Sequence, residues 1–336
     1  MLNFMIMKKI LIFTFAVCGV LSCITSCIDR ESANLNCSPM DIVRLDRVVY
    51  KYSKLSEGER ASADSVMING ISAVTTMLNM GHPDDSAFIK YVNSDAVKMF
   101  TPEVEKNFSD ISDLEQILGC IKVNLSKELP QVKFYDIYSI VSPYRQSMYI
   151  ADSTVLLALN HYLGKSHNAY DGFDEYVKKT KEPQNIPYDV LEALIGTFIP
   201  FETSGNDLVL AKMLYAGAVV EAKMQIVPNA SLEKALEYDK EELDWVEENE
   251  LNLWNSLVSK DLLYSTAYFD FKQLLFPSPN TSVLHNDAPG RVGVYLGYKI
   301  VKSYLEKNQN TTLQMLFEPE FYQSQQTLIV SGYQGK

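Results

Sequence analysis

The sequence predicts an α+β protein that is predominantly α-helical and contains one small β-sheet. Apolar residues recur at helical spacing along most of the chain, whereas residues 132–159 alternate with the period expected of strands. With 47% hydrophobic and 21% charged residues among 336, the composition is that of a folded globular protein. Since composition does not shift after residue 40, we expect one globular domain over residues 41–336.

The N-terminus has the pattern of a bacterial lipoprotein signal peptide over residues 1–26. Two lysines precede an apolar run, and the tetrapeptide Ile24-Thr25-Ser26-Cys27 matches a lipobox. We expect cleavage before Cys27, whose thiol accepts the lipid, and a lipidated tether over residues 27–40. The protein would then lie in the cell envelope, held by its lipid on a membrane, with the outer membrane as the expected one.

Two alternatives for this N-terminal segment stay open. The tetrapeptide that ends at Cys23 is a poorer lipobox, because Leu21 is bulky where a smaller residue is usual. The stretch 10–28 is just long enough to remain as an uncleaved anchor that crosses the bilayer. Polar residues within this stretch weaken the second alternative.

Net charge bears on the kind of partner the protein can bind, and cysteine content bears on whether it contains a disulfide. The net charge is −12, and the chain after residue 26 has no long basic run, so we do not expect a nucleic-acid partner. Once Cys27 carries lipid and the signal is removed, Cys37 and Cys120 are the remaining thiols. We expect Cys120 to be free and buried on an apolar helix face; a disulfide with Cys37 is the alternative in an exported protein.

Secondary-structure patterns in the N-terminal half can be placed in order. Residues 42–46 are short and rich in β-branched side chains, which predicts a strand, and helical spacing follows over residues 57–80. A second helix opens at Pro83. The tetrapeptide Ser112-Asp113-Leu114-Glu115 predicts a capping box for a helix that Pro130 ends. Residues 132–159 then predict two or three strands.

Beyond Pro187 the chain is predicted to be almost wholly helical. The expected helices cover residues 188–198, 207–227, 240–258 and 291–305, with a short last helix after Thr311 or Thr312. Helix 240–258 is rich in acids, which we interpret as a solvated face of an amphipathic helix rather than a metal site.

No pattern typical of a catalytic site occurs in the sequence. The four histidines lack the His-Glu-x-x-His spacing of zinc hydrolases, and there is no Gly-x-Ser-x-Gly elbow. Neither glycine-rich phosphate-binding motif is present. The sequence therefore predicts no catalytic residue, no metal and no cofactor.

Three blocks, taken in order, carry a family resemblance. They are Leu159 to Gly164 after Ala151, Leu210 to Pro228, and the block that begins Pro289-Gly290-Arg291-Val292-Gly293. With the lipobox and the Leu45-Asp46 segment, they make the chain resemble the gliding motility lipoprotein GldB of Bacteroidota over most of residues 40–320. The resemblance implies an envelope lipoprotein without known catalytic activity, whose partners are other envelope proteins in a motility or secretion-associated assembly.

GldB is also distantly similar to predicted zinc peptidases with a His-Glu-x-x-His helix and a later Glu-Gly segment. In that alignment Leu191-Glu192-Ala193-Leu194-Ile195 stands at the first motif and Ala216-Gly217 at the second, so only Glu192 remains of the set. The similarity implies a peptidase-like scaffold that lacks the zinc motif, a pseudoenzyme that now binds something. The alternative is a divergent envelope hydrolase that uses Glu192.

The most specific block offers two interpretations. Arg291 starts a helix in which Gly293 and Gly297 recur four residues apart, flanked by Tyr295 and Tyr298. The first interpretation is close packing, with Arg291 paired to an acid. The second is a ligand cleft lined by Arg291 and the two tyrosines. The twenty tyrosines of the chain also suggest a third function class, a surface glycan- or nutrient-binding lipoprotein.

Overall fold

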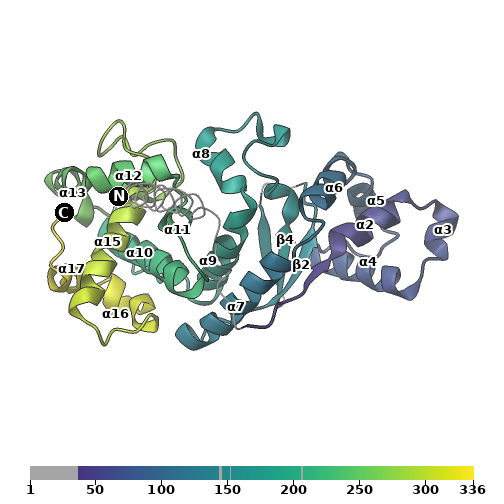
Figure 1. Cartoon of the computed structure of the whole chain (residues 1–336), viewed down its shortest axis with the longest axis horizontal. Helices are drawn as coiled ribbons and strands as arrows, with labels where there is room; N and C mark the ends of the chain where they lie inside the picture. Colours follow the sequence, from purple (N-terminus) through teal and green to yellow (C-terminus); the bar gives the residue numbers. More distant parts are fainter. Residues whose placement is uncertain (1–36, 144–145, 152, 206) are drawn as a thin grey trace, which may run out of the picture. The chain divides into compact units, whose positions relative to one another are not determined.

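A four-stranded sheet separates two groups of helices (Figure 1). The strands are β1 (Ile42–Arg44), β2 (Asp136–Ile140), β3 (Met148–Ala151) and β4 (Thr154–Ala158), in the order β1-β2-β4-β3. The first two pairings are parallel, and β3 adds antiparallel to β4. The predicted α+β class, mainly helical with a small sheet, is confirmed.

The computed structural model describes residues 37–143, 146–151, 153–205 and 207–336. Residues 37–336 form one compact unit. The signal peptide 1–26, the lipid site Cys27 and the tether up to residue 36 lie outside the described residues. Within the described part of the chain, no helix is long and apolar enough to cross a membrane.

Side-chain alternation along the strands builds two cores, one on each face of the sheet. Val155 and Leu157 of β4 are buried in the larger core, whereas Leu156 and Ala158 are buried in the smaller one. This follows from the period of two in a strand, which sends neighbouring side chains to opposite faces. Both faces of the sheet are therefore covered by helices.

The N-terminal helices cover the face with the smaller core. They are α2 (Leu45–Lys54), α4 (Ser65–Met77), α5 (Ser86–Val92) and α6 (Asp95–Asn107), while the short helix α3 (Glu57–Ala61) between α2 and α4 buries no residue. The predicted strand 42–46 is shorter than expected, because α2 begins at Leu45. The predicted helix 57–80 is two helices, since the Asp64 side chain accepts a hydrogen bond from the Met67 amide and caps α4 anew.

The remaining helices cover the other face and extend beyond it. They are α7 (Ser112–Glu128), α8 (Glu175–Lys178), α9 (Ile186–Phe198), α10 (Val209–Ile226), α11 (Leu232–Leu236), α12 (Lys240–Glu248), α13 (Glu250–Ser259), α14 (Tyr268–Leu275), α15 (Val292–Lys307), α16 (Pro319–Tyr322) and α17 (Gln325–Ser331). Those over residues 188–198, 207–227 and 291–305 were predicted within two residues at each end. The predicted helix 240–258 is interrupted at Asn249.

The predicted capping box at Ser112 is wrong. Ile111 is the N-cap residue of α7 and its side chain makes no cap hydrogen bond, whereas Asp110 Oδ1 accepts from the Ser112 amide at 2.9 Å. Glu115, which would have closed the box, instead accepts a hydrogen bond from the Ile42 amide at 2.8 Å. The carboxylate that the local pattern assigned to the helix N-terminus therefore bonds instead to the backbone of a strand that is distant in sequence.

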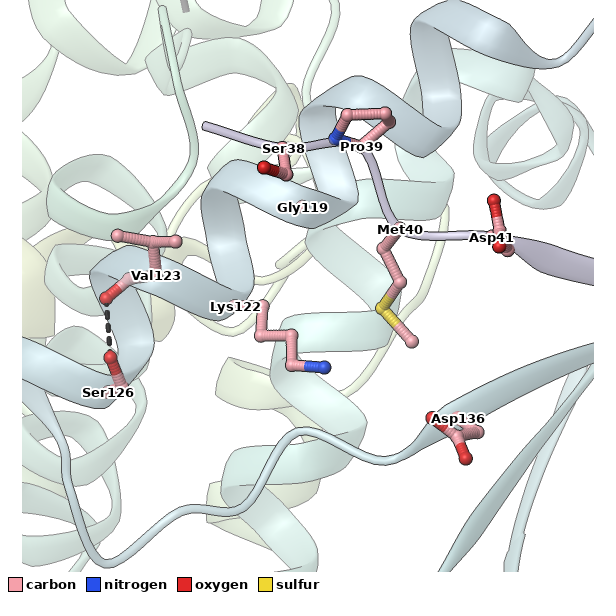
Figure 2. A pocket seen from close by; sticks show the side chains of 9 residues that line it. All are labelled: Ser38, Pro39, Met40, Asp41, Gly119, Lys122, Val123, Ser126 and Asp136. Carbon is pink, nitrogen blue, oxygen red and sulfur yellow. Dashed lines mark hydrogen bonds between the residues drawn. The ribbon is translucent and has the colours of Figure 1, made fainter. Parts of the chain in front are cut away.

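A disulfide joins Cys37 to Cys120 of α7, with 5.2 Å between their Cα atoms. The expectation of a free Cys120 thiol is therefore wrong. The reason is that residues 38–40 lie across α7 at Gly119, where an added Cβ would be 2.0 Å from the Ser38 carbonyl oxygen (Figure 2). Gln116 Nε2 donates to the Cys37 carbonyl at 2.6 Å, which holds Cys37 beside Cys120. These first residues, assigned to the tether by sequence, are fixed to the body.

Helices α10 and α15 touch backbone to backbone where two glycines cross. A Cβ on Gly217 would lie 2.4 Å from the Gly297 carbonyl carbon, and one on Gly297 would lie 2.0 Å from the Met213 carbonyl oxygen. This close approach fixes how the start of α15, which carries Arg291, sits against α10.

Candidate functional site

Five charged side chains from four parts of the fold gather around the N-terminal half of α9. We call Asp189, Glu192, Lys223, Glu237 and Arg291 the charged cluster. The first two lie one turn apart on α9, Lys223 comes from α10, and Glu237 and Arg291 flank the ends of α11 and α15. Charged groups that are wholly or partly buried are usually paired or change protonation, so each has to be accounted for.

Glu192 and Lys223 form an ion pair. The Lys223 side chain is 1% exposed, whereas the Glu192 side chain is 44% exposed, so the pair consists of a buried ammonium under a carboxylate that faces solvent. Burial alone would raise the pKa of Glu192, but Lys223 and Arg291 outweigh it and hold that pKa below its ordinary value. Burial would lower the pKa of Lys223, yet Glu192 and Glu237 raise it.

Glu237 and Arg291 form the second ion pair of the cluster. Both residues have left-handed backbone conformations, with φ of 61° and 64°, which non-glycine residues rarely adopt. Burial opposes the charge of Arg291, but Glu237 and Glu192 raise its pKa above the ordinary value. A left-handed conformation of a non-glycine residue costs free energy, so the surrounding structure must stabilise both Glu237 and Arg291 in the positions where they pair.

Asp189 has no ion-pair partner within 4 Å among the described residues. Its carboxylate accepts a hydrogen bond from the Tyr162 hydroxyl at 2.7 Å. Burial raises the pKa of Asp189 to about 7, Glu237 adds to the rise, and Lys223 opposes it. Lys181 lies near Asp189. Burial lowers the pKa of Lys181, although the negative charges of Asp189 and Glu237 act to raise it. Asp189 therefore changes protonation close to neutral pH.

Two of the four residues that the sequence put forward lie in the charged cluster, and two do not. Glu192 and Arg291 belong to it. Tyr295 is fully buried elsewhere and donates a hydrogen bond to Glu250 at 2.6 Å. Tyr298 is also buried, at 7% exposure. The structure therefore does not bring the tyrosines and Arg291 together as walls of one cleft.

Three members of the cluster were not singled out from the sequence. Lys223 lies on α10, a largely apolar helix that also carries Lys212 and Glu221, so the sequence alone does not set it apart. Asp189 lies three residues before Glu192, the spacing that puts two side chains on one helix face. Glu237 gives no sequence signal, because its left-handed conformation and its partner both depend on the fold.

Glu250, which lies in the predicted acidic helix, is buried rather than exposed to solvent. Interpreted from sequence as part of a solvated face, this residue is 2% exposed. The chain breaks at Asn249 and α13 turns Glu250 inward, where Tyr295, Tyr333 and Lys299 contact its carboxylate at 2.6, 2.9 and 3.1 Å. Glu250 thus ties the C-terminal tail to α15.

The two positions that the expected peptidase-like alignment sets against histidines, Leu191 and Ile195, are apolar. Leu191 and Ile195 are fully buried in the larger core. In the described residues, no group of three or more His, Cys, Asp or Glu side chains is placed to hold a metal ion. What Glu192 contacts instead of a metal is the Lys223 ammonium.

A separate cavity of about 610 Å³ lies beside the disulfide. Figure 2 shows that it is bounded by residues 38–41, by α7 and by the start of β2. Asp41, Lys122 and Asp136 are its charged residues. It shares no lining residue with the charged cluster.

Fold and cluster together define a class of protein: a disulfide-containing α+β chain in which charged side chains from four parts of the fold meet at one site. The disulfide fits an oxidising compartment such as the cell envelope. Within that class, the chain belongs to the gliding motility protein GldB family, which it matches over residues 29–335. No curated protein and no solved structure matches it. Membership makes it a cell-envelope lipoprotein related to gliding motility.

Proposed function

We propose that this chain is a non-catalytic envelope lipoprotein that acts through protein contacts in a gliding-motility or secretion-associated assembly. Membership of the GldB family supports the setting. In this proposal Cys27 carries the lipid and holds the protein on the outer membrane. About ten residues separate Cys27 from the disulfide at Cys37, so the body stays within roughly 35 Å of its anchor.

One observation carries the non-catalytic part of the proposal. Glu192, the acid that would act as the base of a peptidase-like site, is neutralised by Lys223. A carboxylate whose pKa is held below its ordinary value by two cations is a weak proton acceptor near neutral pH. The ion pair therefore supports a non-catalytic scaffold in which these charges stabilise the fold and take part in binding.

The test combines metal analysis with partner capture. The lipidated chain is purified from intact envelopes after mild cross-linking, and its bound metal is measured on the same preparation. The proposal expects far less than one metal ion per chain together with a recurrent partner protein in stoichiometric amount. One tightly bound zinc ion per chain, or no recurrent partner, would contradict it.

A divergent envelope hydrolase is the second candidate function, and Asp189 favours it. Asp189 has a pKa of about 7 and accepts a hydrogen bond from Tyr162, which suits a general acid or base. If the chain is such an enzyme, Asp189→Asn abolishes its function in cells while leaving folding and partner capture intact. Retained function in this variant favours the scaffold.

The glycan-binding alternative has less support. Trp254 is 7% exposed and packs edge-on against Tyr333, with 5.0 Å between ring centroids. It is therefore not available to stack on a sugar. Trp245 is half-buried and contacts the ring of His285, so quenching of Trp245 fluorescence by saccharides remains the measurement that would revive this alternative.

A further inference from the structure

Helix α14 and the residues beside it present aromatic side chains to solvent. We call Tyr264, Tyr268, Phe269, Phe271 and Phe276 the aromatic face. Tyr268 and Phe269 are 62% and 67% exposed, and Phe276, just after the helix, is 40% exposed. Four of the five exposed aromatic side chains in the described part of the chain belong to this face. Single apolar residues on a surface are normal, whereas a concentration of rings on one helix indicates an interaction site.

The rings form one continuous surface that includes a lysine. Phe271 lies between Tyr268 and Phe276, with ring centroids 5.0 and 5.5 Å away in edge-on contact. Lys272 lies between Phe269 and Phe276 on the same side of the helix, at spacings of three and four residues. It is exposed, and it has no ion-pair partner among the described residues. A molecule that covers the rings therefore also meets this ammonium group.

The fold fixes the aromatic face in its outward orientation. Leu274, on the opposite side of α14, is fully buried in the larger core, and a Cβ on Gly293 of α15 would lie 2.9 Å from the Leu274 carbonyl oxygen. Just before α14, the Ser265 carbonyl accepts a hydrogen bond from the Val209 amide of α10 at 2.9 Å. Rotation of α14 to bury its rings would expose Leu274. The rings therefore stay in solvent unless another molecule covers them.

The charge around the aromatic face suits a membrane surface. Residues 262–280 contain one acid and one base, Asp270 and Lys272, whereas the whole chain has a net charge of −12. The Asp270 carboxylate already accepts a hydrogen bond from the Ser265 hydroxyl at 2.5 Å. An anionic bilayer repels acidic surfaces such as that of α12, but it attracts a lysine without a counter-ion. Aromatic rings and lysine stems are also the groups that proteins place between lipid headgroups and acyl chains.

The length of the tether allows this face to reach the membrane of the lipid anchor. The disulfide fixes the tether to α7, which contacts the C-terminal end of α10, where Asn124 donates to the Ile226 carbonyl at 2.9 Å. The aromatic face lies at the other end of α10, beside Val209. With 18 residues, α10 is about 27 Å long. The ten residues from Cys27 to Cys37 span up to roughly 35 Å, which is enough to cover this distance.

We propose that the aromatic face is a second membrane contact, which lies on the surface of the bilayer that holds the lipid anchor. The exposed rings enter the level of the lipid headgroups, and Lys272 meets their phosphates. The inference rests on the proposed function only for the lipid at Cys27. With the anchor and the aromatic face both bound, the body keeps one orientation on the membrane.

The test places a fluorophore on the aromatic face of the lipidated mature chain. Because Cys27 is blocked by lipid and Cys37 is joined to Cys120, Phe269→Cys provides the one free thiol for an environment-sensitive nitrobenzoxadiazole label. The labelled chain is bound to vesicles of phosphatidylethanolamine and phosphatidylglycerol, with and without nitroxide-labelled lipid. We expect a blue shift of the emission and strong quenching by the nitroxide.

Met99→Cys on α6 is the matched control. Met99 is 65% exposed, and α6 lies on the other side of the sheet from α10 and α15 (Figure 1). Its label should be neither shifted nor quenched. Equal quenching at both positions, or none at Phe269, would overturn the inference. A label at Phe269 that responds to protein concentration without vesicles, or only to added envelope proteins, would also overturn it, in favour of a second copy or a partner protein.

A second measurement removes the anchor. The mature chain with Cys27→Ser carries no lipid, so its co-sedimentation with the same vesicles reports on the body alone. Tyr268→Ser with Phe269→Ser should lower the bound fraction several-fold, whereas Met99→Ser leaves it unchanged, and thermal unfolding checks that both variants are folded. Equal binding of the two variants would contradict the inference. Failure of the proposed function differs, since it would show as stoichiometric zinc or as the absence of a recurrent partner.

Discussion

The ion pair of Glu192 and Lys223 is asymmetric, because only the lysine is enclosed. The Lys223 side chain is 1% exposed and that of Glu192 is 44% exposed. Removing the carboxylate leaves an unpaired ammonium in the core, whereas removing the ammonium leaves a carboxylate that water can reach. The two deletions should therefore have different costs, although they break the same contact.

We expect Glu192→Gln to lower the free energy of unfolding by about 3 kcal/mol, and Lys223→Met by about 1 kcal/mol. The double change Glu192→Leu with Lys223→Met should return to within about 1 kcal/mol of the wild type, because an apolar pair needs no counter-ion. Urea denaturation measures all three. Glu105→Gln at the exposed Arg47 pair is the control and should cost less than about 1 kcal/mol. A larger cost for Lys223→Met than for Glu192→Gln would contradict this picture.

Asp189 should make stability depend on pH near neutrality. Its pKa is raised from 3.8 to about 7, so between these values the folded chain holds a proton that the unfolded chain has released. Stability therefore falls as pH rises through this window and levels off above pH 7. Because Asp189 is partly exposed, solvent screening limits the effect to about 1–2 kcal/mol.

Asp189→Asn should remove this slope. The measurement is the free energy of unfolding of both proteins at pH 5 and pH 8. Relative to the wild type, the variant should gain about 1–2 kcal/mol between the two values. Glu192, Lys181, Lys223, Glu237 and Tyr162 face Asp189 in both proteins, so their own contributions cancel in the comparison. Parallel pH profiles would show that Asp189 is not the titrating group.

At this scale the sequence indicated some members of the charged cluster and not others. Arg291 stood out because it belongs to the most specific family block, and Glu192 because it stands where the peptidase-like alignment places the His-Glu-x-x-His motif. Glu237 and Asp189 did not stand out, because the groups that pair with them or shift their pKa are distant in sequence and come close only after folding. Free Cys120 was mispredicted for the same reason: nothing in the local pattern shows that residues 38–40 lie across α7.

The helices were easier to predict than the places where they begin, end or break. Helices α9, α10 and α15 follow the apolar period closely, so their bounds are near those expected. The break at Asn249 and the missing capping box at Ser112 were missed. In both cases a long-range contact, of Glu250 with Tyr295 and of Glu115 with Ile42, decides the local structure.

The crossing of α10 and α15 should be the least tolerant element contact. Gly217→Ala or Gly297→Ala places a methyl group against backbone atoms that cannot move alone, and we expect each to cost about 3 kcal/mol by urea denaturation. Gly196→Ala on α9 is the matched control, because no atom lies within 4 Å of its added Cβ. That variant should gain about 0.5–1 kcal/mol through lower entropy of the unfolded chain. A neutral Gly297→Ala would mean that the helices can separate at little cost.

For the whole molecule, the disulfide closes a loop that contains the N-terminal helical group and β1. Its cysteines are 83 residues apart in sequence. A loop of this length is expected to gain roughly 4–5 kcal/mol from restriction of the unfolded chain, in the entropic account of disulfides.

Replacing both cysteines, Cys37→Ser with Cys120→Ser, should therefore lower the free energy of unfolding by roughly 3–5 kcal/mol. A reductant should lower the stability of the wild type by a similar amount and leave the variant unchanged. Thermal unfolding of the full mature chain with and without reductant measures both. Equal sensitivity of the two proteins to reductant would show that the pair is not joined in the native protein.

If Cys27 carries the lipid, as proposed, the same bond limits how far the body can stand from its membrane. With the disulfide intact, force on the tether is transmitted at Cys37 to α7, a helix of the larger core. Without it, residues 37–41 are held by hydrogen bonds such as Met40 N to Glu115 O and by the buried Met40 side chain, and peeling them away lengthens the tether by roughly 17 Å. Protease cleavage within residues 37–41 should therefore be slow in the wild type and faster in the double serine variant. Equal rates would mean that these contacts fix the segment without the disulfide, and that the disulfide serves stability but not the reach of the anchor.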